Sequence, residues 1–131
     1  MIRRISTELY TEAAYAVYSD CMYKPDYQKY LQHISEPDIL CFGAFHEGEL
    51  SGILIIKEGE ILGIAVHQRV RGHGLGRSLI AHAAQHFSTL SAETDDDSVG
   101  FYRSCGFECT RFERVFPDGI SVRYKCIRKS F

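Results

Sequence analysis

Hydrophobic and polar positions follow two different periods along the 131-residue chain. Between positions 39 and 66, three short runs rich in Ile, Leu, Val and Phe are separated by polar turns at residues 46–49 and 58–59. Such runs predict three strands joined by hairpins. From position 74 the spacing becomes helical and predicts a helix that ends near Phe87. The apolar stripe of that helix consists of Leu75, Leu79, Ile80, Ala83, Ala84 and Phe87.

The amino-terminal third predicts a short strand at residues 2–5 followed by two helices. Thr7 caps the first helix, because a threonine hydroxyl can accept a hydrogen bond from a first-turn N–H group. Pro25 begins the second helix, which ends near Ser35, since proline suits a first helical turn. The apolar face of the first helix consists of Leu9, Ala13, Ala16 and Val17.

The carboxy-terminal part predicts a short helix among three strands. The helix runs from the acids at residues 95–97, which suit the positive end of its dipole, to Cys105, with Gly106 at the C′ position. The order βααβββαβαββ predicts an α/β fold around one mixed, mostly antiparallel sheet. No linker or repeat divides the chain, so we expect a single domain, residues 1–131. The last strands are expected at residues 89–93, 107–116 and 120–127, with a turn at residues 117–119.

Composition and charge place the chain among ordinary globular proteins. With 45% hydrophobic residues and a net charge of −2, general attraction to nucleic acid or to an anionic membrane is not expected. The longest apolar stretch, residues 39–45, is too short to span a bilayer. Five cysteines without a CxxC pair indicate free thiols in a reducing compartment. Because no apolar signal-peptide core follows Arg3 and Arg4, we expect a cytoplasmic protein.

Residues 70–79, VRGHGLGRSL, carry three glycines where the long helix should begin. Glycine is about 1 kcal/mol less favourable than alanine inside a helix, and a tight turn alone would need only one. Backbone N–H groups at a helix N-terminus bind phosphate when no side chain blocks the approach. Gly72, Gly74 and Gly76 therefore predict a phosphate site, to which Arg71 and Arg77 add positive charge.

Two common phosphate-binding motifs do not fit this turn. The P-loop pattern GxxxxGK[ST] is absent, and a dinucleotide-binding GxGxxG would need glycine in place of Arg77. The dinucleotide motif would also open the first βαβ unit, whereas this turn follows three antiparallel strands. Folds that bind ATP or NAD are therefore disfavoured.

The turn fits the pattern R-x-x-G-x-G, read as Arg71, Gly74 and Gly76. The stretch ILGIAVHQRVRGHGLGRSLI resembles the acetyl-CoA-binding motif of the GNAT superfamily of N-acetyltransferases, and GFYRSCGFE resembles its FYxxxGF element. The two motifs lie at the family's usual separation, and the element order of the whole chain is similar to that of the family. The resemblance implies an acetyl-CoA-dependent N-acetyltransferase.

The resemblance also implies a role for each part of the two motifs. The glycine turn holds the CoA pyrophosphate, the pantetheine arm lies along the preceding strand, and Tyr102 donates a proton to the departing thiolate. A phenol suits this role because it is protonated at neutral pH. The asparagine that relatives carry before the tyrosine is replaced by DDDSVG, where Asp97 or Ser98 takes its place. The residues assigned to acetyl-CoA are Ile64, Ala65, Val66, Arg71, Gly72, His73, Gly74, Leu75, Gly76, Arg77 and Ser98.

An amine acceptor must lose a proton before it attacks, because a lysine-like ammonium has a pKa of about 10.4. Some relatives place a glutamate at the head of the central strand, which corresponds to Glu60. By alternation, Glu60 shares a strand face with Leu62, Ile64 and Val66. A solvated turn residue is an equal interpretation of Glu60, and His67 or a water relay are the other candidates for the base.

The function that we expect is direct attack of an amine on acetyl-CoA in a ternary complex. The alternative is a catalytically silent module that senses acyl-CoA or binds a partner, and a homodimer is left open. Residues 19–38 combine acids with Tyr23, Tyr27 and Tyr30, which predicts a small or peptidic cationic amine as the acceptor. An ordinary solvated helix explains the same segment equally well.

Two other groups are expected to carry no chemistry. His82 and His86 have the helical spacing of metal ligands, but no third ligand accompanies them, so no metal is expected. Cys105 is expected to be a small buried hydrophobe.

Overall fold

The fold is that of a computed structural model and is described for residues 1–6, 11–19 and 26–129. The order of its elements confirms the predicted βααβββαβαββ arrangement. The strands are β1 (Ile2–Arg4), β2 (Ile39–His46), β3 (Glu49–Lys57), β4 (Glu60–Val66), β5 (Thr89–Thr94), β6 (Glu108–Phe116) and β7 (Gly119–Lys129). The helices are α1 (Glu12–Ser19), α2 (Tyr27–Ser35), α3 (Leu75–Ala83) and α4 (Val99–Ser104), and a 3₁₀ turn spans Gln68–Val70.

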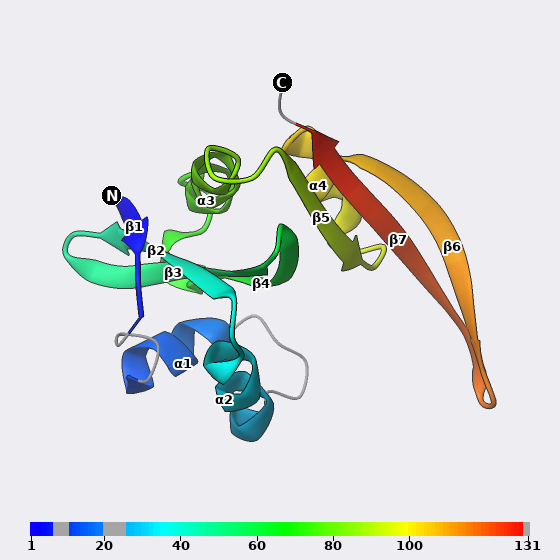
Figure 1. The fold of residues 1–131 in the computed structure, drawn as a ribbon, viewed down its shortest axis with the longest axis horizontal. Helices are drawn as coiled ribbons and strands as arrows, with labels where there is room; N and C mark the ends of the chain where they lie inside the picture. The colour runs from blue at the N-terminus through cyan, green and yellow to red at the C-terminus, as the bar shows by residue number, and fades with distance from the viewer. Residues whose placement is uncertain (7–10, 20–25, 130–131) are drawn as a thin grey trace.

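The strands form one sheet in the order β1-β2-β3-β4-β5-β7-β6, in which only the β4–β5 pair is parallel. Figure 1 shows α1 and α2 on one side of β2–β4 and α3 on the other side. The central strand β3 is buried on both faces, so its apolar residues run continuously and do not alternate with polar ones. Ile53 and Ile55 face the cluster under α1 and α2, whereas Leu54 and Ile56 face the cluster under α3 and α4.

A β-bulge interrupts β4 in its middle. Ile56 of β3 lies opposite Ile61, but its neighbour Ile55 lies opposite Gly63. Leu62 is therefore an extra residue on β4. As a result, Leu62 packs in the cluster of α1 and α2, while Ile64 packs in the cluster of α3 and α4. The expectation that Glu60 shares one face with Ile64 is therefore wrong, because the bulge reverses the alternation between them.

The strands β4 and β5 are paired at only one position. Glu60 lies beside Ser91, and the Ser91 N–H donates to the Gly59 carbonyl at 2.9 Å. Beyond this point the two parallel strands diverge, which splits the sheet into a β1–β4 part and a β5–β7 part (Figure 1). The opening between them lies at the carboxyl ends of both strands.

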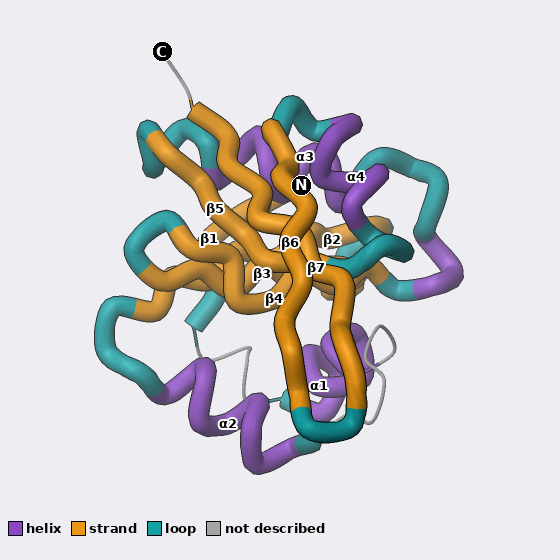
Figure 2. The backbone as a smooth tube through the Cα atoms, turned by 90° about the vertical axis from the view of Figure 1, so that its right-hand side faces the viewer, coloured by secondary structure: helices purple, strands orange, loops and turns teal. Residues whose placement is uncertain are grey.

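The hairpin of β6 and β7 extends well beyond the rest of the sheet (Figure 2). The part of the hairpin just beyond the β5–β7 ladder is tied to β5 through the Glu93 carboxylate, which accepts from Arg114 at 2.8 Å and from Arg123 at 3.2 Å. Burial opposes ionisation of Glu93, but the two guanidinium groups outweigh it and lower the pKa of this carboxyl. The hairpin is therefore held to β5 by charge as well as by the strand ladder.

The helices differ in detail from their predicted form. The helix α2 begins at Tyr27 with Asp26 as its N-cap, and Pro25 lies outside the described residues. The helix α4 begins at Val99, after the acids at residues 95–97 and not within them.

In α1 the buried side chains are Ala14, Val17 and Tyr18, so the predicted apolar face is confirmed at Val17 but wrong at Ala13 and Ala16, which are exposed. The hydroxyl of Thr11 accepts from the Ala14 N–H at 3.2 Å and caps the helix; Thr7 and Leu9 lie outside the described residues. Because α1 has alanines on both its buried and its exposed sides, hydropathy alone does not identify the buried face.

The helix α3 ends at Ala83, earlier than predicted. The N–H groups of Gln85 and His86 bond to carbonyls three residues back, so the chain tightens into a turn after Ala83. The predicted apolar stripe is present, since Leu79, Ile80 and Ala83 are buried. Within the described residues, no helix is long and apolar enough to cross a membrane.

Two turn glycines allow the β4–β5 junction to be tested. Gly48 and Gly59 have similar positive φ values of 79° and 84°. A Cβ at Gly48 would meet no atom within 4 Å, whereas a Cβ at Gly59 would lie 2.6 Å from the Thr89 carbonyl oxygen at the start of β5.

We expect Gly48→Ala to lower the free energy of unfolding by about 1 kcal/mol, the cost of left-handed backbone in alanine. Gly59→Ala should lose about 1–3 kcal/mol more, because β5 must move to admit the methyl group. Urea denaturation of both variants measures the difference. Equal losses would contradict a close junction at Gly59.

Candidate active site

A pocket of about 270 Å³ opens where β4 and β5 diverge. Its walls come from β4, the end of β5, the start of α3 and the amino-terminal half of α4. The site therefore brings together segments that are far apart in the sequence. Its lining residues are Ile64, Val66, Gly76, Thr94, Ser98, Phe101 and Tyr102.

The bulge in β4 decides which backbone groups face this pocket. Before the bulge, the Gly59 carbonyl faces β5 and accepts from Ser91. After the bulge, the His67 N–H faces β3 and donates to the Ser51 carbonyl of that strand at 2.8 Å. In a regular strand these two odd-numbered residues would face the same edge. The reversal turns the backbone groups of Ile64 and Val66 towards the open β5 side.

The three glycines of the turn before α3 are required for different structural reasons. Gly72 and Gly74 have φ values of 89° and 76°, a conformation that side chains other than glycine rarely adopt. A Cβ at either position would meet no atom within 4 Å. A Cβ at Gly76, in contrast, would lie 3.0 Å from the ring of Phe101. Gly76 is therefore needed for packing of α3 against α4, a reason that the sequence did not reveal.

The amino-terminus of α3 carries no side-chain cap. Gly74 is the N-cap residue, and its carbonyl accepts the first helical hydrogen bond from the Ser78 N–H at 2.9 Å. The first-turn N–H groups of a helix have no partner within it, and they carry the positive end of the helix dipole. This end of α3 can therefore bind an anion through its backbone.

A second pocket of about 370 Å³ lies over this helix end and shares Val66 and Phe101 with the first pocket. Arg71 donates through Nε to the Val66 carbonyl at 3.0 Å, and Arg77 donates to the Ser104 carbonyl at 2.8 Å. Both guanidinium groups thus hold the turn against its neighbours as well as adding charge. The two pockets form one path from the glycine turn to the divergence of β4 and β5. The second pocket is lined by Val66, Val70, Arg71, Gly72, Gly74, Leu75, Arg77, Phe101 and Ser104.

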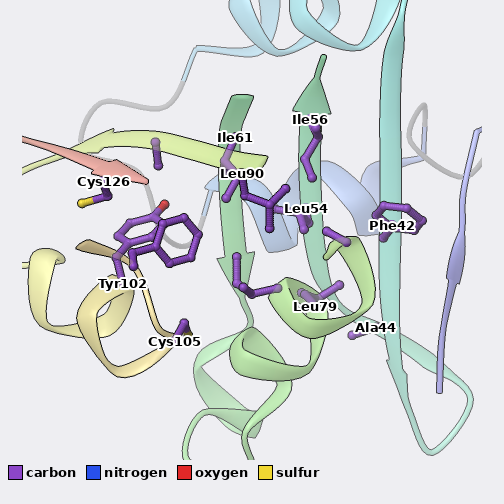
Figure 3. Close-up of a cluster of buried hydrophobic side chains, with 14 of the residues drawn as sticks. Phe42, Ala44, Leu54, Ile56, Ile61, Leu79, Leu90, Tyr102, Cys105 and Cys126 are labelled. Atoms are coloured by element: carbon purple, nitrogen blue, oxygen red, sulfur yellow. The ribbon is translucent and has the colours of Figure 1, made fainter. Parts of the chain in front are cut away.

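Tyr102 projects from α4 towards β5, beside Cys126 (Figure 3). Its side chain is 6% exposed and packs edge-on against Phe101 and Phe107, with ring centroids 5.4 Å and 5.2 Å away. Burial, assisted by nearby thiols and by Asp95, raises the pKa of Tyr102 to about 12. The hydroxyl therefore keeps its proton at neutral pH and can donate it to a basic atom in the pocket.

Local hydrogen bonds fix α4 at both ends. The Asp95 carboxylate accepts from the Ser98 N–H at 3.0 Å at the start. At the end, Gly106 and Phe107 donate to the carbonyls of Arg103 and Tyr102, which is the Schellman pattern expected for a C′ glycine. The ends of α4 therefore set the direction in which Tyr102 projects.

Two members of the acidic run DDDSVG have structural partners. Asp95 caps α4, and Asp96 accepts from the Tyr124 hydroxyl of β7 at 2.6 Å. Ser98 lines the first pocket and makes no side-chain capping bond. These contacts explain why carboxylates are tolerated close to an expected anionic ligand.

The candidate bases lie outside the pocket that holds Tyr102. Glu60 is exposed at the start of β4, where β4 and β5 are still paired. His67 follows β4 and lines a separate pocket of about 230 Å³ with His46 and Glu49. His73, which was predicted to contact acetyl-CoA, is exposed in the glycine turn, and its ring lies 5.6 Å from the tilted ring of His46. Neither Glu60 nor His67 is among the residues that line the Tyr102 pocket.

A family profile for the Acetyltransferase (GNAT) family matches residues 4–107 of the sequence. The chain belongs to this family. Membership confirms the resemblance carried by the two sequence motifs and the N-acetyltransferase class that it implied. No curated protein matches the sequence.

Solved structures of GNAT proteins have the same fold as this acetyltransferase. The ribosomal-protein-S18-alanine N-acetyltransferase from Escherichia coli is 21% identical with a TM-score of 0.78, covering 98% of this chain and 92% of that one. An IAA acetyltransferase from Bacillus cereus is 20% identical with a TM-score of 0.74, covering 99% of both chains. A GNAT acetyltransferase from Elizabethkingia anophelis with acetyl-CoA bound is 16% identical with a TM-score of 0.74, covering 99% and 97%.

In this GNAT protein, several residues of the segment that was expected to select the acceptor make structural contacts instead. The Asp26 carboxylate caps α2, and Glu36 forms an ion pair with Lys57 at 3.0 Å. Tyr30 is fully buried, whereas Tyr27 is 47% exposed. Asp20, Tyr23 and Lys24 lie outside the described residues. Two of the four acids in this segment, Asp26 and Glu36, therefore have structural partners.

A different set of residues forms an aromatic and acidic surface beside this segment. Tyr15 of α1 stacks on Tyr27 of α2 with ring centroids 4.9 Å apart. Both rings, together with Glu12, line a pocket of about 430 Å³. Sequence analysis missed Glu12 and Tyr15, because their place beside Tyr27 depends on the packing of α1 against α2.

The paired histidines of α3 have a packing role. His82 and His86 form a cluster with Phe42, whose ring centroid lies 4.8 Å and 5.2 Å from theirs, and the two histidine rings are 5.4 Å apart. Among residues 1–6, 11–19 and 26–129, no group of three or more His, Cys, Asp or Glu side chains could hold a metal ion. Cys105 is buried, as expected.

Proposed function

We propose that residues 1–131 form one N-acetyltransferase domain that transfers an acetyl group from acetyl-CoA to a primary amine. The observation that carries this proposal is the continuous path from the uncapped start of α3, along the open edge of β4, to the protonated hydroxyl of Tyr102. The free thiols of the described residues, Cys41, Cys105, Cys109 and Cys126, support a cytoplasmic location.

Acetyl-CoA is the co-substrate, and its three parts fit three parts of the path. The pyrophosphate binds the backbone N–H groups of the glycine turn, where the helix dipole favours negative charge. The pantetheine arm, which contains two amides, bonds to the backbone of Ile64 and Val66 as an added strand would. This arrangement brings the thioester to the pocket lined by Tyr102 and Ser98.

The acetyl group moves by direct attack of the amine on the thioester carbonyl. The C–N bond forms, the C–S bond breaks, the CoA thiolate takes the proton of the Tyr102 hydroxyl, and the resulting phenolate regains a proton from water. Because burial keeps that hydroxyl protonated, the acid is in the correct state over the whole physiological pH range. Bringing the two reactants together in one complex supplies much of the acceleration.

Water carries the proton that the amine must lose. Glu60 lies four residues before Ile64, a distance of about 13 Å along an extended strand. That distance is too great for direct proton transfer from an amine at the thioester. Glu60 therefore acts, in this proposal, as the distant acceptor of a water relay that leads out of the pocket.

The acceptor is a cationic amine held by Glu12, Tyr15 and Tyr27. The stacked tyrosine rings offer a negative π-face, and the carboxylate offers a unit charge beside them. Together they favour an ammonium group over a neutral or anionic one.

Replacing Tyr102 by phenylalanine tests the general acid. We expect Tyr102→Phe to lower kcat by about 100-fold, the loss typical of a positioned proton donor, with an unchanged KM for acetyl-CoA. The matched control is Tyr18→Phe, which removes another buried hydroxyl on the opposite face of the sheet and should leave kcat unchanged. Thiol release from acetyl-CoA measures both. An unaltered kcat in Tyr102→Phe would reduce this tyrosine to a packing residue.

A panel of matched cationic, neutral and anionic amines tests the acceptor proposal. We expect the wild-type protein to prefer cationic amines, and Glu12→Gln to raise their KM by about two- to fivefold, as for an exposed ion pair. Glu47→Gln, in the β2–β3 turn, is the control and should not change the KM. Indifference to acceptor charge would contradict the role of Glu12. Binding of acetyl-CoA without turnover on any amine would favour a silent acyl-CoA sensor over an enzyme.

A further inference from the structure

Two cysteines that the acetyl-transfer mechanism does not use face each other across the terminal hairpin. Cys109 of β6 lies directly opposite Cys126 of β7 in the antiparallel ladder. The Cys109 thiol donates to the Phe107 carbonyl at 3.9 Å, and it lies close enough to Cys126 to help raise the pKa of the Cys126 thiol. Both side chains belong to the cluster under α3 and α4, on the side of the sheet where Tyr102 packs (Figure 3 shows Cys126 beside Tyr102).

Directly opposite positions can be joined by a disulfide, with some strain. Opposite residues of antiparallel strands have Cα atoms about 4.5–5.5 Å apart, within the range of about 4.4–6.8 Å that a disulfide spans. Their Cβ atoms are about 4.5–5.5 Å apart, whereas a disulfide prefers about 3.8 Å. The bond would therefore draw β6 and β7 together, and a strained disulfide is more easily reduced than a relaxed one.

The two thiols differ in access to solvent. Cys126 is fully buried, with no exposed surface, whereas Cys109 is only partly buried. Burial raises the pKa of the Cys126 thiol to about 12, so this thiol does not react with an oxidant in solution. An oxidant therefore reaches Cys109 first, and the buried Cys126 lies directly opposite it on β7.

We propose that Cys109 and Cys126 form an oxidation-sensitive dithiol that closes reversibly to a cross-strand disulfide when a small hydroperoxide reaches the hairpin. In the first step the Cys109 sulfur attacks the peroxide, an S–O bond forms, the O–O bond breaks, and water leaves, or an alcohol when the hydroperoxide is organic. In the second step Cys126 attacks the Cys109 sulfenic acid, the S–S bond forms, and a second water leaves with the Cys126 proton. The two sulfurs together lose two electrons, and the peroxide gains them.

Cys105 is the nearest alternative partner in the described chain. It lies at the carboxyl end of α4, is 8% exposed and belongs to the same cluster. It is not in register with either thiol of the hairpin, because it precedes β6. Cys41 belongs to the cluster on the other face of the sheet. The ladder therefore selects Cys126, and not Cys105, as the partner of Cys109.

Peptide mapping of the wild-type protein after hydrogen peroxide tests this pairing without any substitution. Trypsin releases residues 104–111, which contain both Cys105 and Cys109, and residues 126–128, which contain Cys126. Cleavage after Glu108 then separates Cys105 from Cys109. We expect the peptide with Cys109, and not the one with Cys105, to be joined to residues 126–128, and dithiothreitol to release it.

Two alanine variants separate the two steps. In Cys126→Ala the sulfenic acid of Cys109 has no partner, so we expect a dimedone adduct on Cys109 and no linked peptide. Cys105→Ala is the matched control and should give the same linked peptide as the wild type. The proposal is overturned if both hairpin thiols still react with maleimide after peroxide treatment and unfolding, or if the linked peptide contains Cys105.

Discussion

The bulge at Leu62 is the constraint on which the rest of the site depends. An extra residue in β4 reverses the alternation of side chains and backbone groups, so the two halves of the strand present different edges to β5. Near Glu60 the strand still pairs with Ser91, and beyond the bulge no pairing with β5 continues. Beyond the bulge the β4 edge is not paired with β5, and a ligand with amide groups can add to such an edge as a further strand would.

The chemistry also depends on how the two helices beside the opening are locked together. Phe101 fills the space left by the absent side chain of Gly76, so the start of α3 and the middle of α4 are in direct contact. Arg77 reinforces this contact through its hydrogen bond to Ser104. The anion-binding end of α3 and the hydroxyl of Tyr102 are therefore held at a fixed separation, and a ligand that spans them meets a preformed site.

Local patterns predicted the elements, and contacts between distant segments decided the details. The hairpin turns and Gly106 follow from residue types alone, because positive φ values favour glycine. Gly63, a glycine inside an apolar strand, was the available signal for the bulge in β4. The partners of Asp96 and Glu12 had no such signal: Tyr124 lies 28 residues from Asp96, and Tyr27 meets Tyr15 only through helix packing.

Calorimetric titration of acetyl-CoA into the wild-type protein tests most directly the claim that the open β4 edge and the glycine turn form one site. The account predicts saturable binding at one site per chain. It predicts weaker binding in Gly74→Val, because valine rarely adopts the positive φ of this position and its side chain would occupy the open space at the start of α3. The claim would be contradicted by a wild-type protein that binds neither acetyl-CoA nor CoA at millimolar concentration.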